Sequence, residues 1–228
     1  PISVHDSDPD HYLYLDEEKY DYTELFSYGA SNVAVIKYPY LRRSYGTKRK
    51  VTETLMDYML ETAVLAFAAI IIASLFGILF GVLSALNKDS FLDRSLLFTS
   101  VLGMSVPSFY SAIIFSWFFG YVISDITGLN MTGSLFVYDD LGNGEMVMLS
   151  NLILPALTLG IRPISAIMQL TRSSMLDVMS QDYIRTASAK GLKFRTVVIK
   201  HALKNALNPV VTTISGMFAS LLAGALFV

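Results

Sequence analysis

The sequence predicts an all-α membrane protein, a polytopic bundle of transmembrane helices, from its composition and from the spacing of its charges. The 228 residues are 53% hydrophobic and only 16% charged, whereas soluble domains carry about 25% charged residues. The charged residues concentrate in residues 1–61 and then between long uncharged runs. Four of these runs are long enough to cross the ~30 Å apolar core of a bilayer, which takes about 20 helical residues.

The first 50 residues differ from the rest because they are rich in Asp and Tyr and have no clear hydrophobic period. We expect an extracytoplasmic segment over 1–50 with little regular structure, followed by a transmembrane domain over 51–228. Residues 51–61 predict a short helix that leads into the first span. Pro1 is not an initiating Met and Val228 lies inside an apolar run, so we also expect a fragment of a longer chain.

Each long uncharged run predicts a transmembrane helix, because in lipid a helix satisfies its own backbone hydrogen bonds and an open strand does not. Pro107 interrupts the second run, and the third contains Pro155, Pro163 and a single charge, Arg162. The four predicted spans are 62–86, 95–124, 146–171 and a last one that begins near Ala206 and continues to residue 228.

The orientation of the spans follows from the basic residues beside them, because Lys and Arg concentrate in cytoplasmic loops. The loop 125–145 has no Lys or Arg, and the loop 172–205 has seven. The first is therefore predicted outside the cell, and the second, with the short loop 87–94, in the cytoplasm. Six basic residues in 37–50 oppose this orientation, but the rule weakens in long segments.

Composition and residue inventory exclude several kinds of function. The formal net charge of −2 indicates no nucleic-acid partner, and the absence of cysteine excludes disulfides, thiolate catalysis and Cys-ligated metals. An enzyme embedded in the membrane needs a nucleophile with a base, paired carboxylates or metal ligands at bilayer depth. The uncharged runs contain no His, Asp or Glu. We therefore expect no catalytic and no metal-binding residues.

The residues after the third span, 172–209, predict a helix, a break and a second helix. Ser180 or Asp182 can cap a short helix over 183–190, and Gly191 stands where a left-handed C-terminal cap would. This segment therefore predicts a rigid projection at the cytoplasmic end of the bundle.

The composition of the short helix favours a protein partner. Ala187 and Ala189 are small, which allows close approach to a groove on another protein. An ordinary basic loop, attracted to anionic lipid headgroups, is the alternative. Asn208-Pro209 is expected to end the second helix and to open the last span.

The most specific patterns lie in this segment and in the two spans before it. They are Asp182-Tyr-Ile-Arg-Thr-Ala-Ser-Ala-Lys-Gly191, His201-Ala-Leu-Lys-Asn-Ala-Leu-Asn-Pro209, Leu154-Pro-Ala-Leu-Thr-Leu-Gly160, Leu170-Thr-Arg-Ser-Ser-Met-Leu176 and Val106-Pro-Ser-Phe109. The first two resemble the EAA loop of the permeases of binding-protein-dependent ABC importers, in the form of the dipeptide/oligopeptide/nickel subgroup. The resemblance covers roughly residues 47–228. It departs from the general EAA pattern where Arg185 and Thr186 replace the Glu and the first Ala, as in the peptide subgroup.

The resemblance implies a multi-pass permease subunit of the bacterial inner membrane, with a fold of the ABC type I importer kind. Such a subunit forms the translocation pathway for peptides or a related small solute. The implied partners are a second homologous permease subunit, two ATP-binding subunits, an extracytoplasmic substrate-binding protein and membrane lipid. ATP would bind the partner subunits, since no G-x-x-x-x-G-K-[ST] motif occurs here, and no cofactor is expected in this chain.

By the same resemblance, a coupling helix docks on the ATP-binding subunit and passes its movement to the membrane. The coupling residues would be Asp182, Tyr183, Ile184, Arg185, Thr186, Ala187, Ala189 and Lys190, with Gly191 as the turn. The identity of the solute, and whether the second permease subunit is identical or different, stay open.

Candidate residues of the pathway are Ser105, Pro107, Ser108 and Arg162. A packing kink is the alternative for Pro107. For Arg162 we favour a snorkelling side chain near the cytoplasmic end of its helix over a pathway contact. His201 is expected to be a packing residue. An inter-helix contact and a substrate contact both stay open for Asn151, Gln169 and Trp117.

Two other functions compete with this interpretation. A secondary transporter usually has acidic residues or broken helices at mid-membrane in repeated halves, and the runs have neither an acid nor an internal repeat. A polytopic membrane protein without an ATPase partner, such as a scaffold, stays open.

Overall fold

The computed structural model describes residues 3–4, 13–14, 22–28, 32–37, 41, 43–138 and 145–224. The chain divides into two compact units, Pro1–Tyr58 and Met59–Val228. The long first helix begins in the first unit and continues into the second.

The described residues of the first unit form two antiparallel strand pairs. Strands β1 (Ser3–Val4) and β2 (Leu13–Tyr14) form one pair, and β3 (Tyr22–Tyr28) and β4 (Asn32–Lys37) form the other. The expectation of little regular structure over 1–50 is therefore wrong for these strands. The β4 sequence Asn-Val-Ala-Val-Ile-Lys is rich in β-branched residues, which favour strands.

Helix α1 (Val51–Leu86) joins the short helix expected over 51–61 to the first predicted span in one uninterrupted helix of 36 residues. The tight turn after it includes Asp89, whose φ of 62° is left-handed. Helix α2 (Phe91–Ser105) then begins with Ser90 as its N-cap, because the Ser90 side chain accepts a hydrogen bond from the Asp93 backbone N–H.

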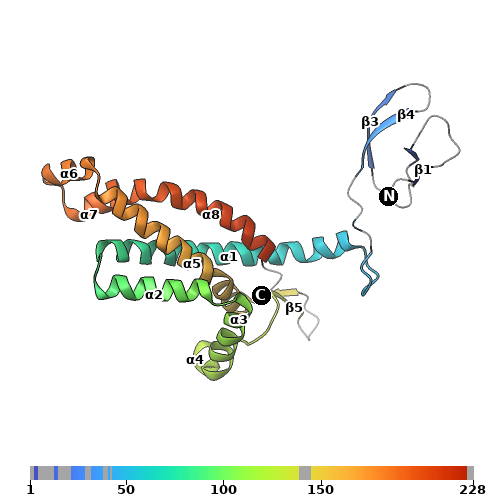
Figure 1. The fold of residues 1–228 in the computed structure, drawn as a ribbon. Coiled ribbons are helices and arrows are strands. Elements are labelled where there is room, and N and C mark those ends of the chain that lie inside the picture. The colour runs from blue at the N-terminus through green and yellow to red at the C-terminus, as the bar shows by residue number, and fades with distance from the viewer. Residues whose placement is uncertain are drawn as a thin grey trace. The chain divides into compact units, whose positions relative to one another are not determined.

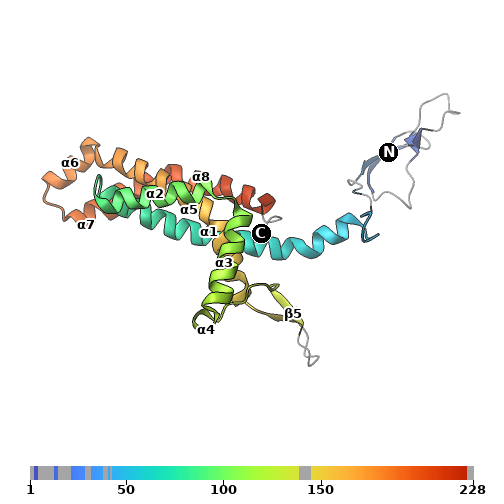
Figure 2. The same ribbon diagram turned by 60° about the horizontal axis from the view of Figure 1, so that its bottom comes forward.

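The second predicted span is two helices rather than one. Helix α2 ends at Ser105, and α3 (Ser108–Trp117) continues at an angle of 108° to it. Proline forces the residue before it towards extended backbone, and Val106 has φ −78° and ψ 129°. Pro107 therefore breaks this span, a much larger change than a kink. Figures 1 and 2 show α3 leaving the direction of α2 in both views.

Short elements follow α3 and lead to the next long helix. They are the π-helix η1 (Phe118–Val122), α4 (Ser124–Thr127), and the antiparallel strands β5 (Phe136–Tyr138) and β6 (Glu145–Val147). Helix α5 (Ser150–Met179) is continuous through Pro155 and Pro163. It begins later than the predicted span and extends two turns further, into the region predicted as a loop.

The segment after α5 contains α6 (Asp182–Ala189), α7 (Phe194–Thr196), the π-helix η2 (Val197–Leu203) and α8 (Lys204–Gly224). These last three elements follow one another without a gap. The prediction that Asn208-Pro209 ends a helix is wrong, because Pro209 lies inside α8. Proline is tolerated in such a helix when neighbouring groups satisfy the freed carbonyl.

Two described helices, α1 and α5, are long and apolar enough to cross a membrane, and the bent pair of α2 and α3 would be a third if it is one span. The sequence predicted four. The fourth prediction corresponds to α8, which is not among these candidates, and it extended to residues 225–228, outside the described residues. The structure is thus mostly helical with two or three candidate spans in its described part.

Helices α1 and α5 approach each other closely within the second unit. The α1 face towards α5 and α8 consists mostly of small residues, and Ala69 and Ala73 are fully buried. A Cβ added to Gly77 would lie 2.8 Å from the Ile167 Cβ, and one added to Gly81 would lie 2.6 Å from the Thr171 Cβ. Small residues at every fourth position allow the two backbones to approach closely, as in membrane helix pairs.

These contacts also set the direction of the helices. Because Gly77 meets Ile167 and Gly81 meets Thr171, α1 and α5 run parallel. The turn between α1 and α2 therefore lies at the same end of the bundle as α6, as Figure 1 shows. The start of α5 lies at the other end. There the Asn151 amide contacts the Asn130 side chain and the Ser134 carbonyl.

Candidate functional site

Helix α6 forms where the sequence predicted a short helix over 183–190. Ile184 and Ala187 are buried, 4% and 8% exposed, in a cluster with Met175 of α5 and Val197 and Ala202 of η2. The apolar side of this short helix is therefore used to fix it to the end of the bundle.

A second contact holds the start of α6. The Asn205 Nδ2 of α8 donates a hydrogen bond to the Tyr183 hydroxyl at 2.8 Å. The capping prediction is wrong, because the N-cap residue is Gln181 and no side chain caps the helix. Ser180 instead donates its hydroxyl hydrogen to the Asp177 carbonyl at the end of α5.

The end of α6 is closed by Gly191, as predicted. Gly191 has φ 78° and donates its N–H to the Ser188 carbonyl at 3.0 Å, while the Leu192 N–H reaches the Ala187 carbonyl at 3.4 Å. These two bonds form a Schellman motif, in which glycine supplies the left-handed residue. The chain therefore turns sharply back into α7.

The opposite side of α6 is exposed and polar. Asp182 and Arg185 form an ion pair of 3.5 Å with side chains 96% and 74% exposed, and such exposed pairs contribute little stability. The other exposed positions of the predicted coupling set are Tyr183, Thr186, Ala189 and Lys190. This face is fixed in place by the buried side of the helix and is available to a partner.

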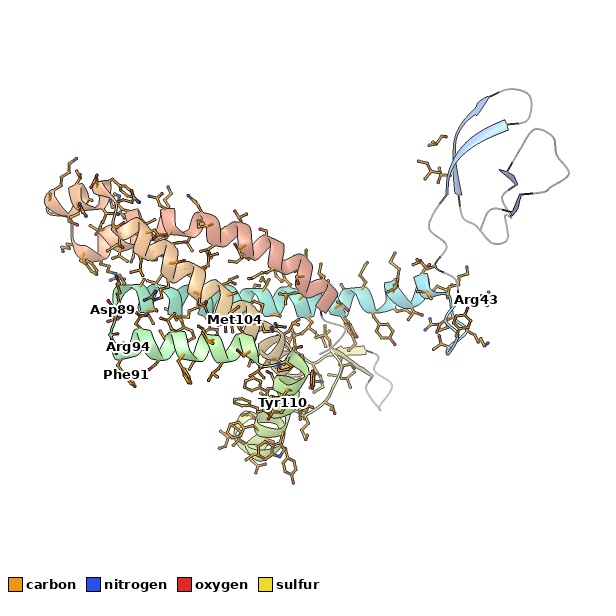
Figure 3. The ribbon with its side chains drawn as sticks, in the orientation of Figure 1. Arg43, Asp89, Phe91, Arg94, Met104 and Tyr110 are labelled. Atoms are coloured by element: carbon orange, nitrogen blue, oxygen red, sulfur yellow. The ribbon has the colours of Figure 1, made fainter. Side chains whose placement is uncertain are left out.

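A polar junction of four residues, Ser84, Asp89, Asp93 and Arg172, lies at the same end of the bundle. The Arg172 Nε and Nη2 donate to the two carboxylate oxygens of Asp93, each at 2.7 Å. The Ser84 hydroxyl and the Asp89 backbone N–H, the latter at 2.9 Å, also donate to Asp93. Figure 3 shows Asp89 with Phe91 and Arg94 at the turn that carries this junction.

The junction joins three helices, because Ser84 belongs to α1, Asp93 to α2 and Arg172 to α5. The Asp93 side chain is only 2% exposed, and that of Arg172 is 19% exposed. Sequence reasoning missed Asp93, and it used Arg172 as a loop charge and as part of the Leu170–Leu176 pattern without assigning it a contact. The one available signal was an acid and a base at the ends of two predicted spans, and it does not reveal that they meet.

The four candidate pathway residues do not form a bonded cluster like the polar junction. Ser105 and Ser108 lie on either side of the break at Pro107, and the Ser105 hydroxyl donates to the Val101 carbonyl of its own helix. No hydrogen bond or ion pair among the described residues joins them to Arg162. The structure therefore relates these four residues only through the helices that carry them.

Arg162 lies in the central part of α5 and is exposed. The interpretation as a snorkelling residue near the cytoplasmic end of its helix is wrong, because α5 extends to Met179. It has no ion-pair partner among the described residues. An unpaired charge in the middle of a membrane-spanning helix is costly where it faces lipid.

The residues with two open interpretations now have recorded neighbours. Gln169 Nε2 donates to the Ser100 hydroxyl at 3.0 Å and lies 3.5 Å from the Met104 sulfur, so it links α5 to α2. Figure 3 labels Met104 at the end of α2. Trp117 lines a mostly apolar pocket of about 450 Å³ between α3 and α5. Gln169 is thus an inter-helix contact, whereas the pocket leaves both interpretations open for Trp117.

Among the described residues, no group of three His, Cys, Asp or Glu side chains is arranged to hold a metal ion. His201 lies in η2, where its carbonyl accepts a hydrogen bond from Asn205.

Comparison with known proteins identifies the family of this chain. Residues 77–228 match the family model described as binding-protein-dependent transport system inner membrane component. This match covers α5, α6, the Gly191 turn and both charged partners of the polar junction.

Several curated proteins are similar to the chain. The dipeptide transport system permease protein of Alkalihalophilus pseudofirmus is 34% identical over 199 residues, which cover 82% of this chain and 60% of that protein. The oligopeptide transport system permease protein of Bacillus subtilis is 38% identical, covering 78% of this chain and 55% of that protein. The dipeptide transport system permease protein of Escherichia coli is 36% identical, with 77% and 57% covered. The chain thus spans little more than half the length of these relatives.

Proposed function

Because the chain belongs to the family of binding-protein-dependent transport system inner membrane components, we propose that it is a permease subunit of an ATP-driven importer of peptides or a related small solute. The observation that carries this proposal is α6, a short helix fixed by its apolar side to the end of the bundle, with a polar side left exposed. Relatives whose names specify dipeptide or oligopeptide transport support the class of solute.

In this proposal the chain does no covalent chemistry. Two ATP-binding subunits hydrolyse ATP, a second homologous permease subunit completes the pathway, and an extracytoplasmic substrate-binding protein delivers the solute. The exposed residues of α6 contact an ATP-binding subunit, with Gly191 as the rigid turn. The complete subunit has the type I importer fold, in which the bent pair of α2 and α3 and the helix α8 also cross the membrane.

The mechanism requires a stiff connection between the ATP-binding subunit and the membrane helices. Coupled conformational change needs two arrangements with different contacts, and a rigid element transmits the difference. Helix α6 meets this requirement because its buried residues pack on both α5 and η2. A displacement of α6 therefore acts on α5 and on the helix that continues from η2 into α8.

The pathway residues also belong to this proposal. Arg162 is exposed in mid-helix, and an unpaired charge there is tolerated where it meets water, solute or another subunit. Ser105 and Ser108 flank the break at Pro107, which leaves backbone groups of α2 and α3 outside regular helix bonding. We place these four residues along the pathway.

Cross-linking tests the docking of α6. The chain has no cysteine, so Arg185→Cys introduces its one reactive thiol, and a short thiol cross-linker is applied to the complex purified with candidate ATP-binding subunits. We expect a covalent product with an ATP-binding subunit. Thr132→Cys is the matched control, since Thr132 is also exposed but lies near the other end of α5. Equal products from both variants, or none from Arg185→Cys, would contradict the proposed function.

A further inference from the structure

We propose that the polar junction makes the hairpin of α1 and α2 move together with α6, so that Asp93 and Arg172 are positioning residues for transport. This inference rests on the proposed function, because it assumes that α6 is displaced by an ATP-binding subunit. It assigns a role to residues outside the EAA-like segment.

The same helix, α5, carries Arg172 of the junction and leads into α6. Helix α5 is uninterrupted from Arg172 to Met179, and α6 begins at Asp182. Two turns of helix, about 10 Å at 1.5 Å per residue, therefore separate Arg172 from the end of α5 that leads into α6. Met175, the α5 residue that clusters with the buried side chains of α6, lies less than one turn from Arg172, so a force on α6 reaches α5 close to the junction.

The geometry of the ion pair fixes orientation as well as distance. Arg172 uses two nitrogens on two carboxylate oxygens, and such a bidentate pair resists rotation in a way that a point contact does not. Because Asp93 is also bonded to Ser84 and to the Asp89 N–H, its carboxylate cannot turn to follow Arg172. A shift of α5 must therefore carry the start of α2 and the end of α1 with it.

Close packing beside the junction reinforces this connection. Thr171, next to Arg172, is fully buried against Gly81 of α1. Apolar packing of this density resists separation of two helices but is not directional. The ion pair fixes the orientation of α2 relative to α5, and the apolar packing keeps α1 and α5 in contact.

A role in stability alone accounts less well for the junction. A buried ion pair is weak support for stability, since well-packed apolar residues in the same volume often stabilise as much. Apolar residues cannot hold α2 and α5 in one register through two aligned hydrogen bonds. The junction is therefore suited to keeping three helices in register while α6 moves.

The test measures one distance in the complete transporter complex. Phe91→Cys and Ser188→Cys place spin labels on exposed positions of α2 and α6 in a chain without other thiols. With the natural junction we expect the same distance distribution with and without ATP. In Arg172→Lys we expect the distribution to change when ATP is added. Lysine keeps the positive charge next to Asp93 but cannot form the bidentate pair, so the variant does not leave the carboxylate unpaired.

A second readout separates this role from a purely structural one. In Arg172→Lys, ATP hydrolysis by the complex is expected to persist while ATP-driven uptake of radiolabelled dialanine falls about tenfold, as for substitutions within other coupling networks. Asp57→Asn is the control, because it removes an exposed ion pair, Arg49 with Asp57, outside the junction. It should change neither the distance nor the uptake.

Two results would overturn the inference. One is a natural junction whose label distance changes with ATP, and the other is an Arg172→Lys complex that behaves like the parent in distance and uptake. Failure of the proposed function is seen separately, as the absence of the Arg185→Cys cross-link to an ATP-binding subunit in the parent chain. That cross-link does not depend on the junction, so the two failures are distinguishable.

Discussion

Gly191 has a backbone conformation that a residue with a side chain adopts only at a cost. Its φ is 78°, and a Cβ added there would meet nothing within 4 Å. Glycine is therefore required by the backbone conformation and not by lack of space. For other L-residues the left-handed region costs roughly 1–2 kcal/mol. The turn after α6 therefore needs glycine for its conformation and has space for a side chain.

We predict that Gly191→Pro uncouples transport from ATP hydrolysis while the protein still reaches the membrane. Proline fixes φ near −65° and removes the N–H that Gly191 donates to the Ser188 carbonyl. The measurement is solute uptake and ATP hydrolysis in reconstituted vesicles. Gly128→Pro is the matched control, because Gly128 has φ 65° and donates its N–H to the Ser124 carbonyl. Normal uptake by Gly191→Pro would count against a coupling role for α6.

Arg162 gives a second prediction at the scale of single residues. If it lines the pathway, Arg162→Cys should react with a charged, membrane-impermeant thiosulfonate, because the thiolate is the reactive form and needs water. Phe98→Cys, 65% exposed on the apolar surface of α2, should react much more slowly. The measurement is the labelling rate of each single-cysteine variant. Similar rates at the two positions would remove Arg162 from the pathway.

At the scale of elements, the contact between α1 and α5 depends on glycine. Gly81 lies against the Thr171 side chain, and an added Cβ would also lie 2.7 Å from the Met168 carbonyl oxygen. A backbone atom cannot move aside as a flexible side chain can. The two helices would have to separate to admit even one methyl group.

We predict that Gly81→Ala lowers the free energy of unfolding of the detergent-solubilised protein by about 1–3 kcal/mol, as in other overpacked cores. Gly216→Ala is the control, because Gly216 also lies in a helix, α8, and an added Cβ there meets nothing within 4 Å. Alanine should leave that helix unchanged or stabilise it by about 1 kcal/mol. The temperature of half-unfolding of each variant is the measurement. Equal values for both variants would contradict the close packing.

At the scale of the whole second unit, the parallel direction of α1 and α5 places two connections at one end of the bundle. The turn at Asn87–Ser90 and the helix α6 lie at the same end of the bundle as the polar junction. The Asn130–Ser134 segment lies at the opposite end, beside the start of α5. The basic residues of 172–205 predict that the end with α6 faces the cytoplasm.

This arrangement predicts the sidedness of labelling. In intact cells stripped of any outer barrier, Thr132→Cys should react with an impermeant thiol reagent, and Ser188→Cys and Lys88→Cys should react only after the membrane is opened. All three positions are exposed, so the difference would report the membrane and not burial. Labelling of Ser188→Cys from outside would invert the orientation.

The fold could be predicted from the sequence where the signal is local. Uncharged runs located α1 and α5, and the pattern of Asp182 to Gly191 located α6 and its left-handed turn. These features depend on solvent and on backbone preferences, which neighbouring residues determine. The same local reasoning failed at Pro107 and Pro209, since proline breaks one helix and is accommodated in the other.

The sequence by itself determined that this chain is a helical membrane protein of a transporter family, because lipid imposes apolar length and the α6 segment keeps a specific pattern. Only the tertiary structure decided which helices pack together, that α2 and α3 diverge by 108°, and that Asp93 meets Arg172. Those residues are 79 positions apart. Such contacts depend on the close packing of helices that lie far apart in the sequence. A local sequence pattern does not show which helices pack together.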